Sequence, residues 1–199
     1  MIDRARAHMP GGMPMAWMAA AVHPVPAADR GLGAGGRGAR PPLPRPAVAV
    51  HLVGHPGQQS ALSRLRADPA LLGPAVEELL RFDSPVQLVG RVARADAVLG
   101  PLTVEAGQQV LVCLGAANRD RAAFAEPDQI RIGRAGPAHL AFGHGRHFCA
   151  GAALARLEAT EILRRLLVMD PGFYTCQADV ERGSSPAFRR LAHLTLRAG

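Results

Sequence analysis

The chain has 199 residues, a length that suits one domain of ordinary size or part of a larger protein. Hydrophobic residues make up 48% and charged residues 20%, which argues against wholesale disorder and against a fibrous repeat. The formal net charge is +7, and all 23 basic residues are arginine, a bias typical of GC-rich coding more than of a nucleic-acid-binding surface. No apolar run reaches the roughly 18 residues of a membrane span. We therefore expect a soluble protein that binds neither nucleic acid nor membrane.

Residues 1–54 differ sharply in composition from residues 55–199, and we treat them as a separate low-complexity segment. They hold 8 Gly and 8 Pro in 54 positions. We expect residues 1–46 to lack stable structure, because they offer too little apolar surface to offset the chain entropy lost on folding. Two other interpretations stay open. Residues 13–22 resemble the apolar part of a secretory signal, although Pro14 interrupts them, and the whole segment is consistent with GC-rich coding read in the wrong frame.

The first two helices are expected soon after position 54. Residues 57–66 carry leucines at helical spacing. Pro74 stands at a plausible first helical position, and residues 75–81 (AVEELLR) are rich in helix formers. Pro85 stops any continuation of this second helix.

The middle of the chain favours strands and a long loop. Strand-like runs occupy residues 86–92, 97–104 with a break at Gly100-Pro101, and 109–114. Residues 118–136 show no periodicity and are expected to form the loop.

The last long element is a helix over residues 150–170, which Pro171-Gly172 ends. Two short strands are expected after it, the last near residues 192–196. Together these elements predict a mainly α chain with small β-sheets, an α+β fold. The apolar side of the long helix is expected to comprise Leu154, Leu157, Ile162, Leu166 and Leu167.

Three cysteines, Cys113, Cys149 and Cys176, are odd in number and widely spaced, so they do not indicate a disulfide framework. This pattern suits the reducing cytoplasm.

The most informative segment is FGHGRHFCAG, residues 142–151, which places Cys149 directly before the long helix. Its three glycines, Gly143, Gly145 and Gly151, let the backbone turn tightly and approach a bulky planar group. The helix N-terminus offers unpaired N–H groups and a partial positive charge, which favour a thiolate. A thiolate is a metal ligand, so this loop is a candidate metal or cofactor site.

Two other interpretations of the loop stay open at this point. One is a glycine-rich turn with an inert, buried cysteine. The other is a zinc site made by His139, His144, His147 and Cys149. Ligands crowded on one short loop suit a tetrahedral zinc site poorly, and no second Cys/His cluster lies elsewhere in the sequence.

The segment resembles the cysteine-ligand loop of the cytochrome P-450 superfamily, in the form with F-G-H-G and a histidine two places before the cysteine. Residues 78–81 (ELLR) are similar to the family's helical E-x-x-R. The resemblance covers residues 55–199, the C-terminal part of that fold, and leaves residues 1–54 unmatched. Further similar stretches are AANRD at 116–120, HLAF at 139–142 and ALARLE at 153–158.

The resemblance implies that Cys149 is the proximal thiolate ligand to the iron of haem b (iron protoporphyrin IX). Phe142 would pack beside the ring and the sulfur, and the three glycines would keep the loop close to the macrocycle. His147 and Arg91 match positions that hold a haem propionate. Without the resemblance, these two residues are an ordinary loop histidine and a solvated strand arginine.

Glu78 and Arg81 are three residues apart, so by spacing alone they form a surface ion pair that contributes about a few tenths of a kcal/mol. The resemblance instead implies a buried structural pair that braces the long loop. Family members usually add an arginine from that loop, whereas residues 127–130 here read PDQI, so the third partner is missing at that place. Candidates for its role are Gln129, Arg131 and Arg134.

By resemblance, the activity is that of a haem-thiolate monooxygenase, which inserts one atom of dioxygen into a small organic substrate with electrons from a ferredoxin or flavoprotein. The family activates oxygen with an acid–alcohol pair on a helix before E-x-x-R. This chain has no Thr before Thr103 and no Ser before Ser60, so we expect a truncated protein that lacks this helix. The alternative is a non-catalytic homologue or fragment that binds a partner protein. Arginines near the cysteine loop, among them Arg146, are candidates for an acidic partner's docking face.

Overall fold

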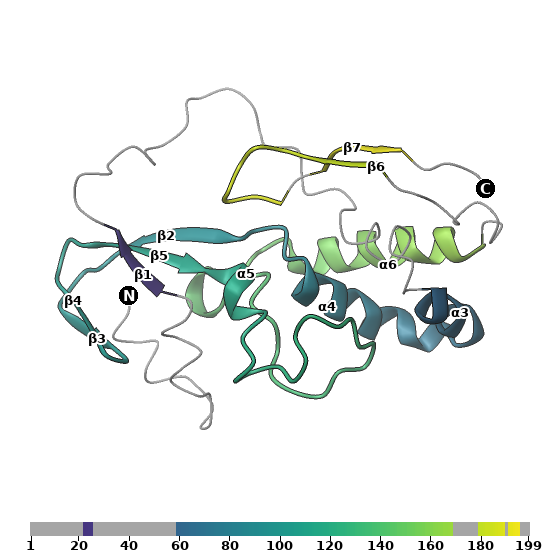
Figure 1. Ribbon diagram of the computed structural model, residues 1–199, viewed down its shortest axis with the longest axis horizontal. Coiled ribbons are helices and arrows are strands. Elements are labelled where there is room, and N and C mark those ends of the chain that lie inside the picture. The colour runs from purple at the N-terminus through teal and green to yellow at the C-terminus, as the bar shows by residue number, and fades with distance from the viewer. Residues whose placement is uncertain (1–21, 26–58, 169–178, 190, 196–199) are drawn as a thin grey trace.

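The computed structural model describes residues 22–25, 59–168, 179–189 and 191–195. These parts of the chain are mainly helical with small antiparallel sheets, which confirms the expected fold class (Figure 1). The main helices gather at one end of the molecule and the largest sheet lies at the other; they are α3 (Gln59–Ala67), α4 (Leu72–Phe82) and α6 (Ala152–Val168). In the described ranges, no helix has the length and apolar character needed to cross a bilayer.

Asp68 and Pro69 set the turn between the first two helices. The Asp68 carboxylate accepts a hydrogen bond from the backbone N–H two residues later at 3.0 Å, and Pro69 opens the short 3-10 helix η2 (Pro69–Leu71). Helix α4 begins at Leu72, so Pro74 is its third residue. The sequence predicted that Pro74 would be the first. The first four N–H groups of a helix have no partner within it, so the missing N–H of Pro74 breaks no helical bond.

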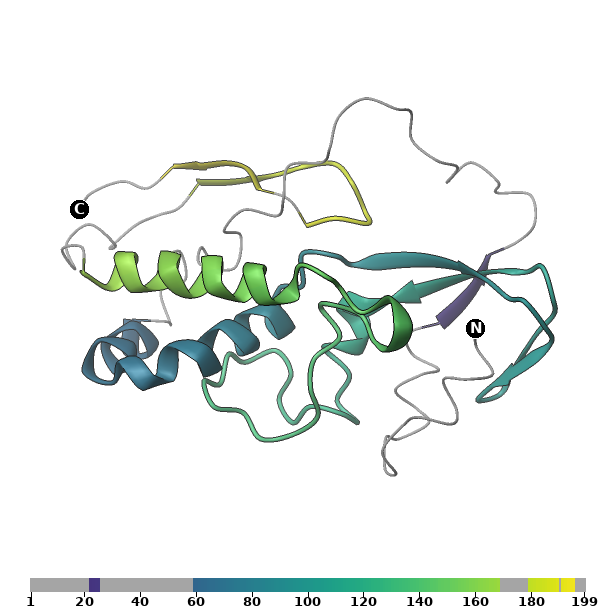
Figure 2. The same ribbon diagram turned by 180° about the vertical axis from the view of Figure 1, so that it is seen from behind.

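The core lies between α3, α4 and α6. Leu65 of α3, Val76 and Leu79 of α4, and Leu163 of α6 are almost completely inaccessible to solvent. This packing sets α6 alongside α4, with α3 against their far end (Figure 2). The position of α6 is therefore fixed by leucines in its second half.

The predicted apolar side of α6 is wrong in its first half. Leu154 and Leu157 are 54% and 67% exposed, whereas Ile162, Leu166 and Leu167 pack against the core as expected. The face that meets α4 repeats at positions 152, 155–156, 159, 162–163 and 166–167, which is a helical spacing that leaves out 154 and 157. The two leucines lie outside that face and are exposed.

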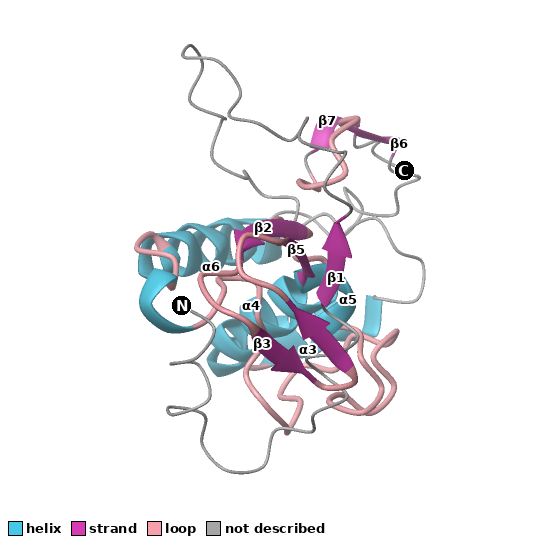
Figure 3. Ribbon diagram, turned by 90° about the vertical axis from the view of Figure 1, so that its left-hand side faces the viewer, coloured by secondary structure: helices cyan, strands magenta, loops and turns pink. Residues whose placement is uncertain are grey.

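The sheets are small and antiparallel (Figure 3). In the largest, β5 lies between β1 and β2, and Leu88 opposes Cys113 in the register of β2 with β5. Gly100, with a φ of +60°, turns the hairpin β3–β4, so the predicted break at Gly100-Pro101 is observed. The strands are β1 (Val22–Val25), β2 (Leu88–Val92), β3 (Ala97–Leu99), β4 (Leu102–Val104), β5 (Gln109–Cys113), β6 (Asp179–Arg182) and β7 (Leu191–Thr195).

Strand β1 is the described part of the low-complexity segment. It pairs with β5, with Val22 opposite Val112 and Val25 opposite Gln109. At these four residues the structure differs from the expected lack of regular structure in residues 1–46. Pro24 is tolerated because β1 is an edge strand, where a missing N–H breaks no central ladder. The other residues before 59 lie outside the described ranges, so the interpretation of segment 1–54 stays a prediction.

The chain between β5 and α6 is mostly irregular. It begins with a single helical turn, α5 (Leu114–Ala117), where the sequence predicted only the end of a strand. Residues 118–136 then form the expected long loop, without helix or strand. A 3-10 turn, η3 (Gly145–His147), precedes α6. The fold thus brings this long irregular stretch back to the start of α6.

Candidate functional site

Cys149 lies three residues before the start of α6. The segment that joins the long loop to this helix is green in Figure 2. Its backbone N–H donates a hydrogen bond to the carbonyl of Phe142 at 3.0 Å, and its carbonyl accepts one from the N–H of Ala152 at 3.2 Å. These bonds close the loop and join it to the helix. The thiol is exposed, as are all residues from 144 to 151. The cysteine is therefore not the inert, buried residue that the sequence alone left open.

Two glycines of the loop adopt backbone angles that other residues rarely accept. Gly143 and Gly145 both have a φ of +74°. At Gly151, an added Cβ would have the Cys149 sulfur, 3.9 Å away, as its neighbour within 4 Å. The sulfur thus lies beside main chain that carries no side chain.

Cys149 stands just before the N-terminus of α6. The first turn of α6 contains no acidic residue, so its unpaired N–H groups leave a partial positive charge near Cys149. Arg146 and His147 stand in η3, three and two residues before the cysteine. The segment from 142 to 151 thus carries basic side chains and no acidic one.

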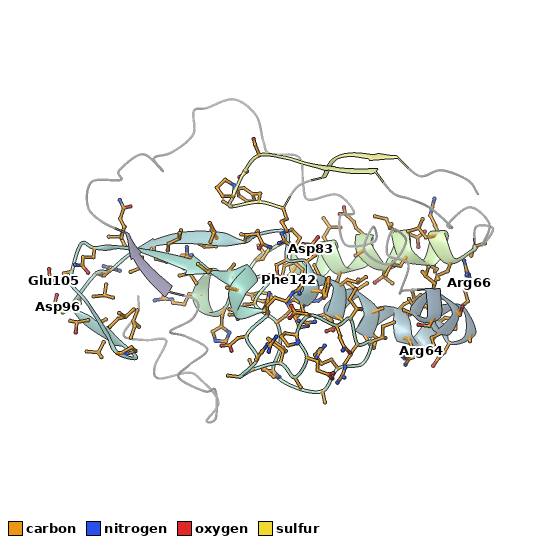
Figure 4. All side chains as sticks on the ribbon, in the orientation of Figure 1. Arg64, Arg66, Asp83, Asp96, Glu105 and Phe142 are labelled. Carbon is orange, nitrogen blue, oxygen red and sulfur yellow. The ribbon has the colours of Figure 1, made fainter. Side chains whose placement is uncertain are left out.

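Phe142 is half-buried and lies near the middle of the molecule, between the helices and the sheet (Figure 4). Its ring centroid is 6.2 Å from that of Phe148, in an edge-on arrangement, and 5.8 Å from that of His139. The guanidinium of Arg156 lies 4.7 Å from the centre of the same ring. Phe142 therefore has neighbours from both the loop and α6.

Arg91 and His147, the residues expected to hold a propionate, are both exposed. Arg91 stands near the end of β2, where the last three residues of the strand are exposed, and its guanidinium donates to the carbonyl of Gly90 at 2.8 Å. The structure leaves both side chains accessible to a ligand on the open surface.

Glu78 and Arg81 form a buried ion pair that is anchored to the long loop. Arg81 donates from Nε and Nη2 to the two oxygens of Glu78 at 2.8 and 2.9 Å. Its remaining N–H groups bind the carbonyls of Asn118, Pro127 and Gln129 at 2.8, 2.9 and 3.1 Å. The side chain of Arg81 is only 2% exposed. A surface pair is thereby excluded.

Arg134 supplies the third charged partner that seemed missing at residues 127–130. Its Nε lies 3.0 and 3.1 Å from the oxygens of Glu78, and its other N–H groups bind carbonyls of the loop. The backbone N–H of Arg131 also donates to Glu78 at 2.8 Å. Burial raises the pKa of Glu78, but the hydrogen bonds from Arg81, Arg131 and Arg134 outweigh it and lower the pKa below its ordinary value. The arginine that residues 127–130 lack is therefore supplied by Arg134, four residues further along the chain.

Three polar residues around the loop were not singled out from the sequence: Glu77, Asn118 and Arg156. Asn118 is fully buried, donates to the hydroxyl of Ser84 at 2.6 Å and accepts from the N–H of Leu140 at 2.7 Å. It thus links Ser84, just after the end of α4, to the irregular stretch before the cysteine loop. In the sequence, Asn118 is noted only as part of the AANRD stretch. The groups that it joins are visible only in the fold.

The geometry does not support the zinc alternative. Among the described residues, no three His, Cys, Asp or Glu side chains come together as a set of metal ligands. His139 is instead turned toward Glu77, 3.3 Å from its carboxylate. The exposed Cys149, beside glycines and the half-exposed Phe148, leaves room for a bulky planar group on this surface.

Comparison with known proteins gives consistent matches. The family model for Cytochrome P450 matches residues 57–168. The biotin biosynthesis cytochrome P450 of Bacillus subtilis is 45% identical over 137 residues, which cover 69% of this chain and 33% of the relative. Cytochrome P450 107B1 of Saccharopolyspora erythraea is 44% identical over 153 residues, covering 75% of this chain and 37% of the relative.

Solved structures agree in fold. The crystal structure of P450BioI in complex with hexadec-9Z-enoic acid ligated acyl carrier protein matches with a TM-score of 0.66 and 42% identity, over 74% of this chain and 37% of that one. The hydroxylase HmtN of himastatin biosynthesis matches with a TM-score of 0.69 and 35% identity, over 76% and 41%. The chain thus spans about a third of the length of the curated relatives it matches. Their family has haem b as its cofactor, and the protein described here belongs to that family, the cytochromes P450.

Proposed function

We propose that this chain provides the haem-binding part of a haem-thiolate monooxygenase, with Cys149 as the iron ligand. The observation that carries the proposal is the exposed Cys149 thiol at the start of α6, held by a hydrogen bond between its N–H and the carbonyl of Phe142. The family match covers both this loop and the buried Glu78–Arg81 pair.

The other loop residues have distinct proposed roles. Gly143, Gly145 and Gly151 leave the sulfur side of the loop free for a planar ring. Phe142 packs beside the sulfur, and Arg91 and His147 bind the propionates through charge-assisted hydrogen bonds. When bound, the haem would supply the activation of dioxygen, and donation of electron density by the thiolate favours O–O cleavage.

The substrate is proposed only as a small organic molecule. Relatives carry names as different as vitamin D(3) 25-hydroxylase and beta-dihydromenaquinone-9 omega-hydroxylase, and P450BioI was crystallised with an acyl carrier protein. Such variety supports oxygen insertion as the common reaction and singles out no one substrate. We propose a ferredoxin or flavoprotein as electron donor and the cytoplasm as the site of action.

The test of this proposal is the spectrum of the reconstituted chain. After addition of haem, reduction and exposure to carbon monoxide, the 199-residue chain is expected to show the red-shifted Soret band of a thiolate-ligated haem. A Soret band at the position of a histidine-ligated haem, or failure of the folded chain to bind haem, would contradict the proposal.

The alternative, a non-catalytic protein that binds a partner, is favoured by one feature of the sequence. Ahead of Glu78 there is no Thr, and Ser60 and Ser63 are the only serines, so no acid–alcohol pair of the family's type is available to hold a proton. We expect the reconstituted chain to consume reductant without oxidising a panel of small apolar substrates. Product measured against reductant consumed checks this, and coupled hydroxylation would show that the chain needs no such pair.

A further inference from the structure

Adjacent glutamates of α4 contact different parts of the molecule. Glu78 binds the long loop, whereas Glu77 faces α6 and the segment before the cysteine loop. Arg156 of α6 donates to Glu77 from Nε at 2.7 Å and from Nη2 at 2.9 Å, which is a bidentate ion pair. The Glu77 side chain is half-exposed, so this contact stands at the rim of the core.

His139 approaches the same carboxylate from the loop. Its Nε2 lies 3.3 Å from Glu77, and its side chain is only 6% exposed. Its Nδ1 accepts a hydrogen bond from the N–H of Ala141 at 3.1 Å, so the proton of a neutral ring is on Nε2 and points to the carboxylate side. Within the described residues this Nε2 has no well-aligned hydrogen-bond partner, which leaves Glu77 as its nearest acceptor.

Both partners of Glu77 contact the ring of Phe142. The Arg156 guanidinium lies 4.7 Å from the ring centre, and the His139 ring centroid is 5.8 Å away. The carbonyl of Phe142 in turn accepts the N–H of Cys149. Three successive contacts therefore connect the Glu77 carboxylate to the peptide that carries the thiol.

We propose that Glu77 is a positioning residue for the cysteine loop: through Arg156 and His139 it holds Phe142, and through Phe142 it fixes the backbone of Cys149. The proposal concerns the loop itself and stands whether or not haem binds. The contact with His139, opposed by partial burial and aided by Arg156, lowers the pKa of Glu77 to about 2. The residue is therefore an anion at neutral pH, and Glu77→Gln removes a charge while keeping the size of the side chain.

The experiment is amide hydrogen exchange at neutral pH on the full chain without haem. In Glu77→Gln we expect the amides of residues 142–149 to exchange roughly three- to tenfold faster, with the amides of α4 unchanged. Glu77→Asp is expected to recover part of the protection, because it keeps the carboxylate. The matched control is Glu161→Gln on α6, since Glu161, like Glu77, contacts two basic side chains, here those of Arg164 and Arg165, but stands beyond the loop on the second half of the helix. It should leave the loop as in wild type.

Arg156→Lys gives an independent test, because lysine keeps the positive charge but loses the bidentate contact and the planar group over Phe142. It should accelerate exchange in the same residues. Exchange that is unchanged in both variants would overturn the proposal, as would equal acceleration in α4, which would make Glu77 a general stability residue. No recovery by Glu77→Asp would likewise count against it.

Discussion

Replacement of Arg81 by methionine is expected to lower the free energy of unfolding by about 3–5 kcal/mol, the range for breaking a buried ion pair by removal of one partner. Methionine fills similar space but donates no hydrogen bonds. The buried Glu78 carboxylate therefore loses one of its arginine partners. The carbonyls of Asn118, Pro127 and Gln129 also lose a hydrogen-bond donor. Urea denaturation followed by circular dichroism measures the effect.

Arg164→Met is the matched control for this experiment. Arg164 also pairs with a glutamate three residues earlier, Glu161, through two N–H groups, but this pair is exposed on α6. The same substitution at the same helical spacing should leave the denaturation midpoint almost unchanged. Equal midpoints for the Arg81 and Arg164 variants would mean that burial of the pair does not matter for stability.

Cys149→Ala is expected to abolish the thiolate-type ferrous–carbon monoxide spectrum of the reconstituted chain completely. Alanine keeps the backbone N–H that binds the carbonyl of Phe142, so the loop retains its closure while the ligand is removed. Cys113→Ala serves as the control, because Cys113 is a free thiol in strand β5 whose burial raises its pKa and disfavours the thiolate. An unchanged spectrum in Cys149→Ala would identify another ligand, with His144 and His147 the first to examine.

Sequence signals gave the helices and strands because those signals are local. Pro85 stops a helix through its own backbone geometry, and α4 ends before it at Phe82; Gly100 likewise turns a hairpin wherever that hairpin lies in the fold. Leu154 and Leu157 misled because their type predicts burial, while their direction depends on what packs against α6. Propensity and periodicity describe single elements, so they cannot assign a face to a partner.

The candidate site shows the same division. Cys149 and its glycines were apparent because the loop is one contiguous segment. The role of Arg134 was visible only as one of three candidates, since its partner Glu78 lies 56 residues away. Glu77 was missed because the pattern E-x-x-R directs attention to its neighbour, and nothing local in the sequence shows that His139 and Arg156 meet it. Contacts between distant elements need the fold.

The way Arg81 and Arg134 hold the long loop has a consequence for how this part of the gene can change. Most of their loop contacts are to backbone carbonyls, at residues 118, 125, 127 and 129. Every amino acid has the same backbone carbonyl. The contacts of the two guanidinium groups therefore depend on the path of the main chain and little on which side chains it carries. Point substitutions there leave the anchors in place, whereas insertion or loss of a single codon moves every later carbonyl out of reach. We therefore expect the length of this loop to tolerate less change than its amino-acid sequence.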